Sequence, residues 1–293
     1  MRLSTSTNIM DRVFGIRGAI SLNECIKKCS KAGYRVLDMN FCHVSGKNEH
    51  LSRDDWESWI DNLADKAKEY GIEFSQAHNI IYNICDRSIS GREWLEELTK
   101  RAFICSGRLG VKWIVMHAGT NCDKVYSANE SKRMNIEYIK DYANLAQKFN
   151  MGIAIENMFD YDGRIFISST EELIDLVDSI NEPNIGVCWD FGHANLTKEN
   201  QCESLKQIGK RLKATHVNDN NGSKDEHLAP FFGNINWNSL MKTLSDIGYD
   251  GDFTYEIQGF SDNLPKDARE SMLDLTVDIG KYLVNLAKDS ELV

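Results

Sequence analysis

Short runs of apolar and β-branched residues recur along the whole chain, and each run is followed by a segment with a different periodicity. Eight such runs predict eight strands, at residues 3–7, 34–39, 72–77, 113–116, 153–155, 185–189, 214–217 and 253–257. Strands of a parallel sheet covered by helices are short and almost wholly apolar. The pattern therefore favours buried parallel strands.

The segments between these runs repeat their apolar residues at helical spacing. They predict helices within 22–29, 56–67, 94–103, 136–146, 173–180, 205–212, 237–247 and 272–286. Ser21 and Ser169 each begin a capping box, and Gly33, Gly71 and Gly248 follow three of the helices as stop signals.

Strand and helix thus alternate eight times within 293 residues. This order predicts an α/β protein, a single (β/α)8 TIM barrel domain over residues 1–293. An open doubly wound sheet is the alternative, but no GxGxxG motif follows the first predicted strand.

Composition narrows the possible partners. The formal net charge is −10 and no cluster of Lys and Arg stands out, so we expect no nucleic acid partner. No apolar run approaches the roughly 20 residues of a membrane span, so we expect no membrane partner. Eight cysteines without a CxxC pair, and a strand-like run directly at the start, lead us to expect reduced thiols and a cytoplasmic protein.

The functional side chains of such a barrel gather at the carboxyl ends of its strands. Carboxylates and imidazoles close six of the predicted strands or follow in the next loop: His78, His117, Glu156, Asp190, His193, His216, Asp225, His227 and Glu256. One strand-end histidine alone is usually structural, but these residues come from different strands and would all point to one axis. His43 is a further candidate for this end of the barrel. Trp113 and the pair Phe231–Phe232 are candidate apolar walls, with core packing equally suitable for Trp113.

Carboxylate and imidazole ligands suit one divalent ion of Mn, Mg, Co or Zn. Several motifs, in this order, resemble those of the xylose isomerase-like barrels, which include sugar isomerases and epimerases and share ancestry with endonuclease IV. They are Asp190–His193 (DFGH), His216–Asn220, Asp225–Pro230, Gly233–Trp237, and Gly248–Gly251 ahead of Tyr255–Glu256. The resemblance extends from the first strand to Glu256.

This resemblance implies that Glu156, Asp190, His216 and Glu256 are the metal ligands and that His193 contacts the substrate. It also implies that Glu156 and Glu256 act as acid and base on a sugar or sugar phosphate, through a metal-stabilised enediolate. A homodimer or tetramer is common among such barrels. The loop 220–224 is either a phosphate site or an ordinary turn. Some ketose epimerases have an Arg soon after the metal-binding His, and no Arg lies between His216 and His227.

Three alternatives remain open. An endonuclease IV-like phosphodiesterase would hold three zinc ions, with His78, His117, His193, Asp225 and His227 as additional ligands. The acidic composition, Glu226 where that family favours Arg, and the lack of basic aromatic inserts argue against it. A keto-inositol dehydratase or a non-catalytic sugar-binding barrel would use the same scaffold, and the intact carboxylates argue against the latter.

Overall fold

Eight parallel strands surround one axis in the computed structural model, which describes residues 1–10, 20–121, 126–161, 163–262, 264–265 and 268–289. The sheet order is β7-β6-β5-β4-β3-β2-β1-β8. The strands are β1 (Arg2–Ser6), β2 (Val36–Asn40), β3 (Glu73–His78), β4 (Trp113–His117), β5 (Gly152–Glu156), β6 (Ile185–Asp190), β7 (Leu212–His216) and β8 (Asp252–Tyr255).

The barrel closes between β7 and β8. The N–H of Val217, directly after β7, donates to Thr254 O at 2.7 Å, and the N–H of Glu256 donates to Val217 O at 3.0 Å. These two bonds continue the ladder around the barrel, so the predicted (β/α)8 fold is confirmed.

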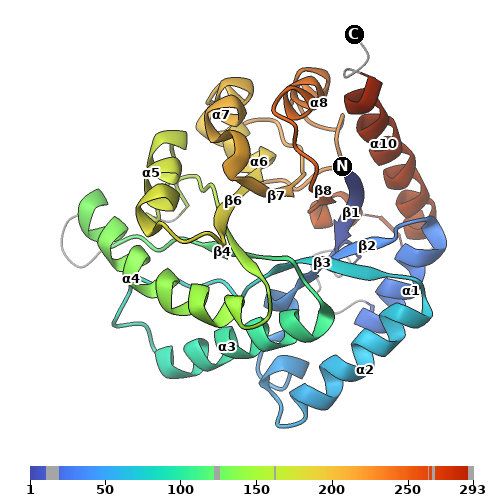
Figure 1. Ribbon diagram of the computed structural model, residues 1–293. Helices are drawn as coiled ribbons and strands as arrows, with labels where there is room; N and C mark the ends of the chain where they lie inside the picture. The colour runs from blue at the N-terminus through green and yellow to red at the C-terminus, as the bar shows by residue number, and fades with distance from the viewer. Residues whose placement is uncertain (11–19, 122–125, 162, 263, 266–267, 290–293) are drawn as a thin grey trace.

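Helices form an outer ring around the strands (Figure 1). They are α1 (Leu22–Ala32), α2 (Trp56–Glu69), α3 (Arg92–Leu109), α4 (Ala128–Gln147), α5 (Thr170–Ile180), α6 (Phe191–Thr197), α7 (Gln201–Ile208), α8 (Trp237–Asp246), α9 (Gln258–Asp262) and α10 (Arg269–Asp289). Short 3-10 helices within the described residues are η1 (Phe41–Val44), η2 (His50–Ser52) and η3 (Gly209–Arg211). Helix α10 packs against both α8 and α1 and completes the ring. Among the described helices, none has the length and apolar character to cross a membrane.

The predicted helix signals act as expected at α1. The Ser21 side chain accepts a hydrogen bond from the N–H of Glu24 at 3.3 Å and caps the helix. Gly33 ends it with φ of 116°, a left-handed conformation that glycine adopts without a Cβ clash. Cys25 and Cys29 are buried on the inner face, so both thiols belong to the core.

The helix predicted at 205–212 is wrong in its last turn. Helix α7 ends at Ile208, where Gly209 takes φ of 52° and ψ of −126° and interrupts the helical hydrogen bonds. Leu212 then begins β7 and is buried in the barrel. Its apolar side chain continued the helical spacing by coincidence, because a buried strand start and a helix stripe both require an apolar residue.

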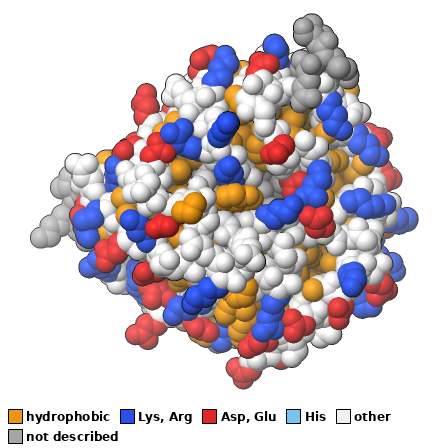
Figure 2. Space-filling model, viewed as in Figure 1, with side chains coloured by type: hydrophobic (Ala, Val, Ile, Leu, Met, Phe, Trp, Pro, Cys, Tyr) orange, Lys and Arg blue, Asp and Glu red, His pale blue; other side chains and the backbone are white. Residues whose placement is uncertain are grey.

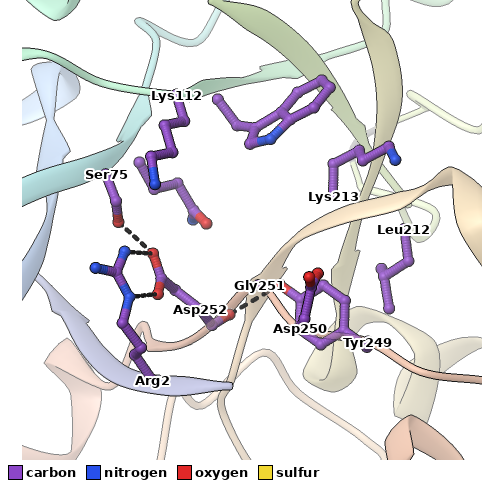
Figure 3. A pocket seen from close by; sticks show the side chains of 11 residues that line it. Arg2, Ser75, Lys112, Leu212, Lys213, Tyr249, Asp250, Gly251 and Asp252 are labelled. Carbon is purple, nitrogen blue, oxygen red and sulfur yellow. Dashed lines mark hydrogen bonds and ion pairs between the residues drawn. The ribbon is translucent and has the colours of Figure 1, made fainter.

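The amino ends of the strands form the face opposite the carboxyl ends, and a cavity of about 330 Å³ opens there (Figure 3). Arg2 donates to both carboxylate oxygens of Asp252 at 2.8 and 3.0 Å, and Ser75 donates to the same carboxylate. These bonds join β1, β3 and β8 at one point. Salt-bridged groups at this end of a barrel serve stability.

Acidic and basic side chains are interspersed over the face of the molecule that Figure 2 shows.

Trp113 lines this cavity and packs against the buried cluster of Val115, Ala154, Cys188 and Ala214, so of its two predicted roles core packing applies and a wall of the functional end does not. Because it begins β4, its side chain lies at the amino end of the barrel. A Cβ on Gly152, in the neighbouring strand, would approach the indole ring to 2.0 Å. Because Gly152 has no side chain, the indole ring of Trp113 can occupy the space beside it.

Candidate active site

Four strand ends bring three carboxylates and one imidazole together. Glu156 ends β5, Asp190 ends β6, His216 ends β7, and Glu256 directly follows β8. One candidate ligand atom from each residue lies within 4.8 Å of the other three. The first three residues are at most 1% exposed and Glu256 is 7% exposed. A dense, buried acidic cluster of this kind requires a positive counter-charge.

Glu156 lies at the centre of a larger group. Its Oε1 is hydrogen-bonded to His216 Nδ1 at 2.7 Å. Its Oε2 lies 2.9 Å from His117 Nε2 and 3.4 Å from His78 Nε2, but it accepts no well-aligned hydrogen bond from any described residue. The imidazoles of β3 and β4 therefore face the same carboxylate as His216, and the His78 ring stacks on the His216 ring at a centroid distance of 5.3 Å.

A third group adjoins the first two. His227 Nε2 lies 2.9 Å from Asp225 Oδ2, and His193 Nε2 lies 3.9 Å from the same oxygen. The Nδ1 atoms of both histidines face main-chain carbonyls, Glu256 O at 2.8 Å and Asn157 O at 2.9 Å. All nine residues predicted for the site are thus adjacent at one end of the barrel.

The local sequence fixes Asp190 in place. Its carboxylate caps α6 by accepting from the N–H of His193 at 2.7 Å, and it also accepts from Asn218 Nδ2 at 2.8 Å. Asn157 accepts from the N–H of Asp190 at 2.6 Å. A Cβ on Gly192 would lie 1.8 Å from Asn218 Oδ1, so only glycine allows this approach. Helix α6 itself was not predicted, because its short run shows no complete apolar stripe.

Asp38 is a buried residue of the site that the sequence analysis missed. Its Oδ2 lies 3.7 Å from His216 Nε2, on the far side of the ring from Glu156, and accepts from Gln76 Nε2 at 2.8 Å. At 3.7 Å the Asp38 and His216 atoms are adjacent but do not form a direct hydrogen bond. The available signal was an Asp between the apolar residues Leu37 and Met39 of a predicted strand.

Charge interactions oppose burial at these groups. Burial tends to raise the pKa of Glu156, but the His216 imidazole helps to hold it well below its ordinary value. Burial raises the pKa of Asp190 to about 6. Burial tends to lower the pKa of His227, but Asp225 outweighs this effect and the pKa rises to about 10. Without a metal, the His227 imidazole is therefore protonated at neutral pH. A cation bound to the imidazoles of this group would displace such protons.

A cavity of about 290 Å³ leads from solvent to this cluster, and His43 lines it as expected. Met158, Phe159 and Tyr161, which follow β5, supply its apolar side. The pair Phe231–Phe232 does not line it, so that prediction is wrong. Both rings are half exposed, because the loop carries them to the outer surface, where they contact Tyr282 and Phe260. We call this space, from Glu156 to Tyr161, the mouth cavity.

The loop 220–224 folds as a turn that uses its own N–H groups. The N–H of Gly222 donates to Asn220 Oδ1 at 2.8 Å, and the N–H of Asn221 donates to Glu226 Oε2 at 2.9 Å. These two donors are therefore not free to hold a phosphate group.

Asp219 organises the long loop that carries Asp225 and His227. Its Oδ1 accepts from the N–H groups of Asn220 and Ile235 at 2.9 and 3.2 Å. Its Oδ2 accepts from the N–H of Phe231 at 3.0 Å and from Trp237 Nε1 at 2.8 Å. One fully buried carboxylate thus fixes both ends of the loop.

Asp219→Asn should lower the free energy of unfolding by about 2–4 kcal/mol, because an amide nitrogen in place of either oxygen leaves two buried donors without an acceptor. Urea denaturation measures this change. Asp246→Asn is the matched control: its carboxylate is exposed and pairs with Lys242 at 3.3 Å, so we expect a change within about 0.5 kcal/mol. Equal stability of the two variants would contradict the assigned role.

The sequence and the fold both resemble those of known proteins. The family model described as xylose isomerase-like TIM barrel matches residues 26–275. An uncharacterized protein of Methanocaldococcus jannaschii is 35% identical over 131 residues, which cover 44% of either chain. Inosose isomerase of Bacillus velezensis is 23% identical over 245 residues, covering 81% of this chain and 83% of that enzyme. The structure of a D-tagatose 3-epimerase-like protein superimposes with a TM-score of 0.78 at 22% identity and covers 99% of both chains.

Proposed function

Since the chain belongs to the xylose isomerase-like TIM barrel family, we propose that it is a divalent-metal-dependent isomerase or epimerase of sugars or sugar phosphates. The observation that carries the proposal is the convergence of Glu156, Asp190, His216 and Glu256 at one end of the barrel, where Glu156 and Glu256 line the mouth cavity. The names of two similar proteins, an inosose isomerase and a D-tagatose 3-epimerase-like protein, support the substrate class.

The four residues suit a divalent cation. Three carboxylates and one imidazole are a ligand set for Mn²⁺, Mg²⁺, Co²⁺ or Zn²⁺, and Glu156 Oε2 lacks an aligned donor among the described residues. An ion held there would supply positive charge that offsets the negative charge gathering on substrate oxygens as a proton leaves the neighbouring carbon.

Glu156 and Glu256 are the proposed acid and base. They come from β5 and β8, on separate parts of the rim, so a substrate between them would meet one carboxylate on each side. Burial tends to raise the pKa of Glu256, but His216 and His227 hold it below the ordinary value, which favours the ionised form that removes a proton. Return of a proton to the same carbon from the opposite face gives epimerisation, and return to the adjacent carbon gives isomerisation through an enediolate.

Hydrogen exchange tests this proposal whichever product the enzyme forms. The metal-loaded protein is incubated in deuterium oxide with D-tagatose, D-psicose, D-fructose, their phosphates and a keto-inositol. Proton NMR then measures the signals of the hydrogen atoms on the carbons next to the carbonyl. We expect deuterium to enter one of these positions in at least one compound. Lack of exchange in all of them, with the metal bound, would contradict the proposed reaction.

A three-zinc phosphodiesterase is the second candidate, and one specific observation favours it. The His78–His117–Glu156 group and the His193–Asp225–His227 group both adjoin the four-residue cluster, so further imidazoles and a further carboxylate are at hand for additional ions. The ligand types alone therefore do not separate the two enzymes.

Nucleic acid binding does separate them. With a net charge of −10, we expect no nanomolar binding of an oligonucleotide containing an abasic site at physiological salt, since phosphate neutralisation dominates such affinity. Fluorescence anisotropy of a labelled duplex measures this. Nanomolar binding, together with hydrolysis of the strand by the zinc-loaded protein, would rank the phosphodiesterase first.

A further inference from the structure

Three carboxamide side chains line one side of the mouth cavity. Asn8 follows β1, Asn40 ends β2, and Gln258 begins α9 just after β8. Because β8, β1 and β2 are neighbours in the sheet, the three residues form one continuous surface, which we call the amide wall. None of them was singled out by the sequence, since an Asn or Gln after a strand is typical of any loop.

Each residue of the amide wall has an oxygen atom that needs a donor. The three side chains are 2%, 4% and 7% exposed, in the order Asn8, Asn40 and Gln258. Neither Oδ1 of the two asparagines nor Oε1 of the glutamine accepts a hydrogen bond from any described residue. Buried acceptors without a partner are rare in folded proteins, and here three of them border the same cavity. Such a cluster fits a ligand that brings its own donors.

The opposite side of the cavity has different chemistry. Met158 and Phe159 follow β5, which lies four strands from β1 around the barrel, so they face the amide wall across the mouth. Phe159 also packs against the His193 ring at a centroid distance of 5.0 Å. A ligand in this cavity therefore meets hydrogen-bond acceptors on one side and apolar carbon on the other.

We propose that Asn8, Asn40 and Gln258 determine substrate specificity by accepting hydrogen bonds from the hydroxyl groups of a polyhydroxylated carbon chain. A sugar has this character, with O–H groups along one edge and C–H groups along another. The inference rests on the proposed function and adds to it, because it assigns hydroxyl recognition to residues outside the metal and acid–base groups. A site that bonds a hydroxyl rejects an analogue without it, since its own polar atoms are then left unpaired.

Asn40→Leu and Gln258→Leu remove the acceptors at similar side-chain size. For the metal-loaded variants, isothermal titration calorimetry with D-tagatose and D-psicose should show binding at least about tenfold weaker than in the wild type. KM should rise by the same factor while kcat changes less, because the lost bonds form in the bound ground state. Asn62→Leu on α2 is the control: it is an exposed Asn that donates to Ser58 O on its own helix, so it should leave binding unchanged.

A second readout separates ligand recognition from a structural role. Amide oxygens without protein partners contribute little to folding, so both Leu variants should keep or exceed the thermal midpoint of the wild type in the absence of sugar. A fall of several degrees in the thermal midpoint would contradict the role of the amide wall in recognising hydroxyl groups, and so would a variant that binds both ketoses as tightly as the wild type. Either result would leave the proposed function unaffected. A wild-type protein that binds none of the ketoses, ketose phosphates or keto-inositol of the exchange test while retaining its metal would contradict the proposed function and, with it, this ligand class.

Discussion

Glu256→Gln is expected to lower the exchange rate by about 10²–10⁴-fold and to leave the fold intact. The amide can neither take up a proton nor provide an anionic ligand, and general acid–base groups contribute effects of this size. The fold should persist because His227 contacts Glu256 through its main-chain carbonyl, which the substitution retains. NMR exchange rates and circular dichroism measure the two effects.

The control for this variant is Glu137→Gln. This glutamate is on α4, far from the rim, and pairs with the exposed Arg133, so its exchange rate should equal that of the wild type. If Glu256→Gln exchanges as fast as this control, Glu256 has no part in proton transfer.

Removal of the metal is expected to have the second large effect. After dialysis against a chelator the protein should show no hydrogen exchange, and its thermal midpoint should fall. The carboxylates of the cluster repel one another without a cation, and an ion present at 100 times its dissociation constant stabilises the folded state by about 2.7 kcal/mol. Differential scanning calorimetry before and after chelation measures the shift.

Restoring Mn²⁺, Mg²⁺, Co²⁺ or Zn²⁺ to the chelated protein should recover both exchange and stability. Because imidazoles must lose their protons to bind a cation, this recovery should be weaker at pH 5 than at pH 8. A chelated protein that exchanges hydrogen normally and unfolds at an unchanged temperature would contradict a resident metal.

The fold was predictable because its local signals agree with one another. Most of the strands are short runs of apolar or β-branched residues, and Ser21, Gly33 and Ser169 begin or end helices as their chemistry requires. The exception is Leu212, where a strand start matched a helical stripe and Gly209 decided the outcome.

The clustered residues were predictable for a related reason. A parallel barrel directs every strand end to one rim, so a carboxylate or imidazole directly after an apolar run has its position fixed by topology alone. This explains why Glu156, Asp190, His216 and Glu256 were found together. Their assignment as metal ligands remains a prediction that the experiments above address.

Other parts of the site depend on packing that strand counting does not give. Asp38 was missed because it was included in an apolar run, although its side chain points to His216. The position of Phe231 and Phe232 on the outer surface follows from the Asp219 hydrogen bonds that shape their loop. The unpaired oxygens of Asn40 and Gln258 become visible only when every neighbour of each atom is known.

The content of metal per chain, measured by elemental mass spectrometry on protein purified without chelator, tests the central claim most directly. A metal-dependent sugar isomerase or epimerase built on the four-residue cluster predicts one Mn, Mg, Co or Zn ion per chain. Three zinc ions per chain would contradict that account and favour phosphodiester hydrolysis. No metal, in protein that still catalyses exchange, would contradict the metal centre itself.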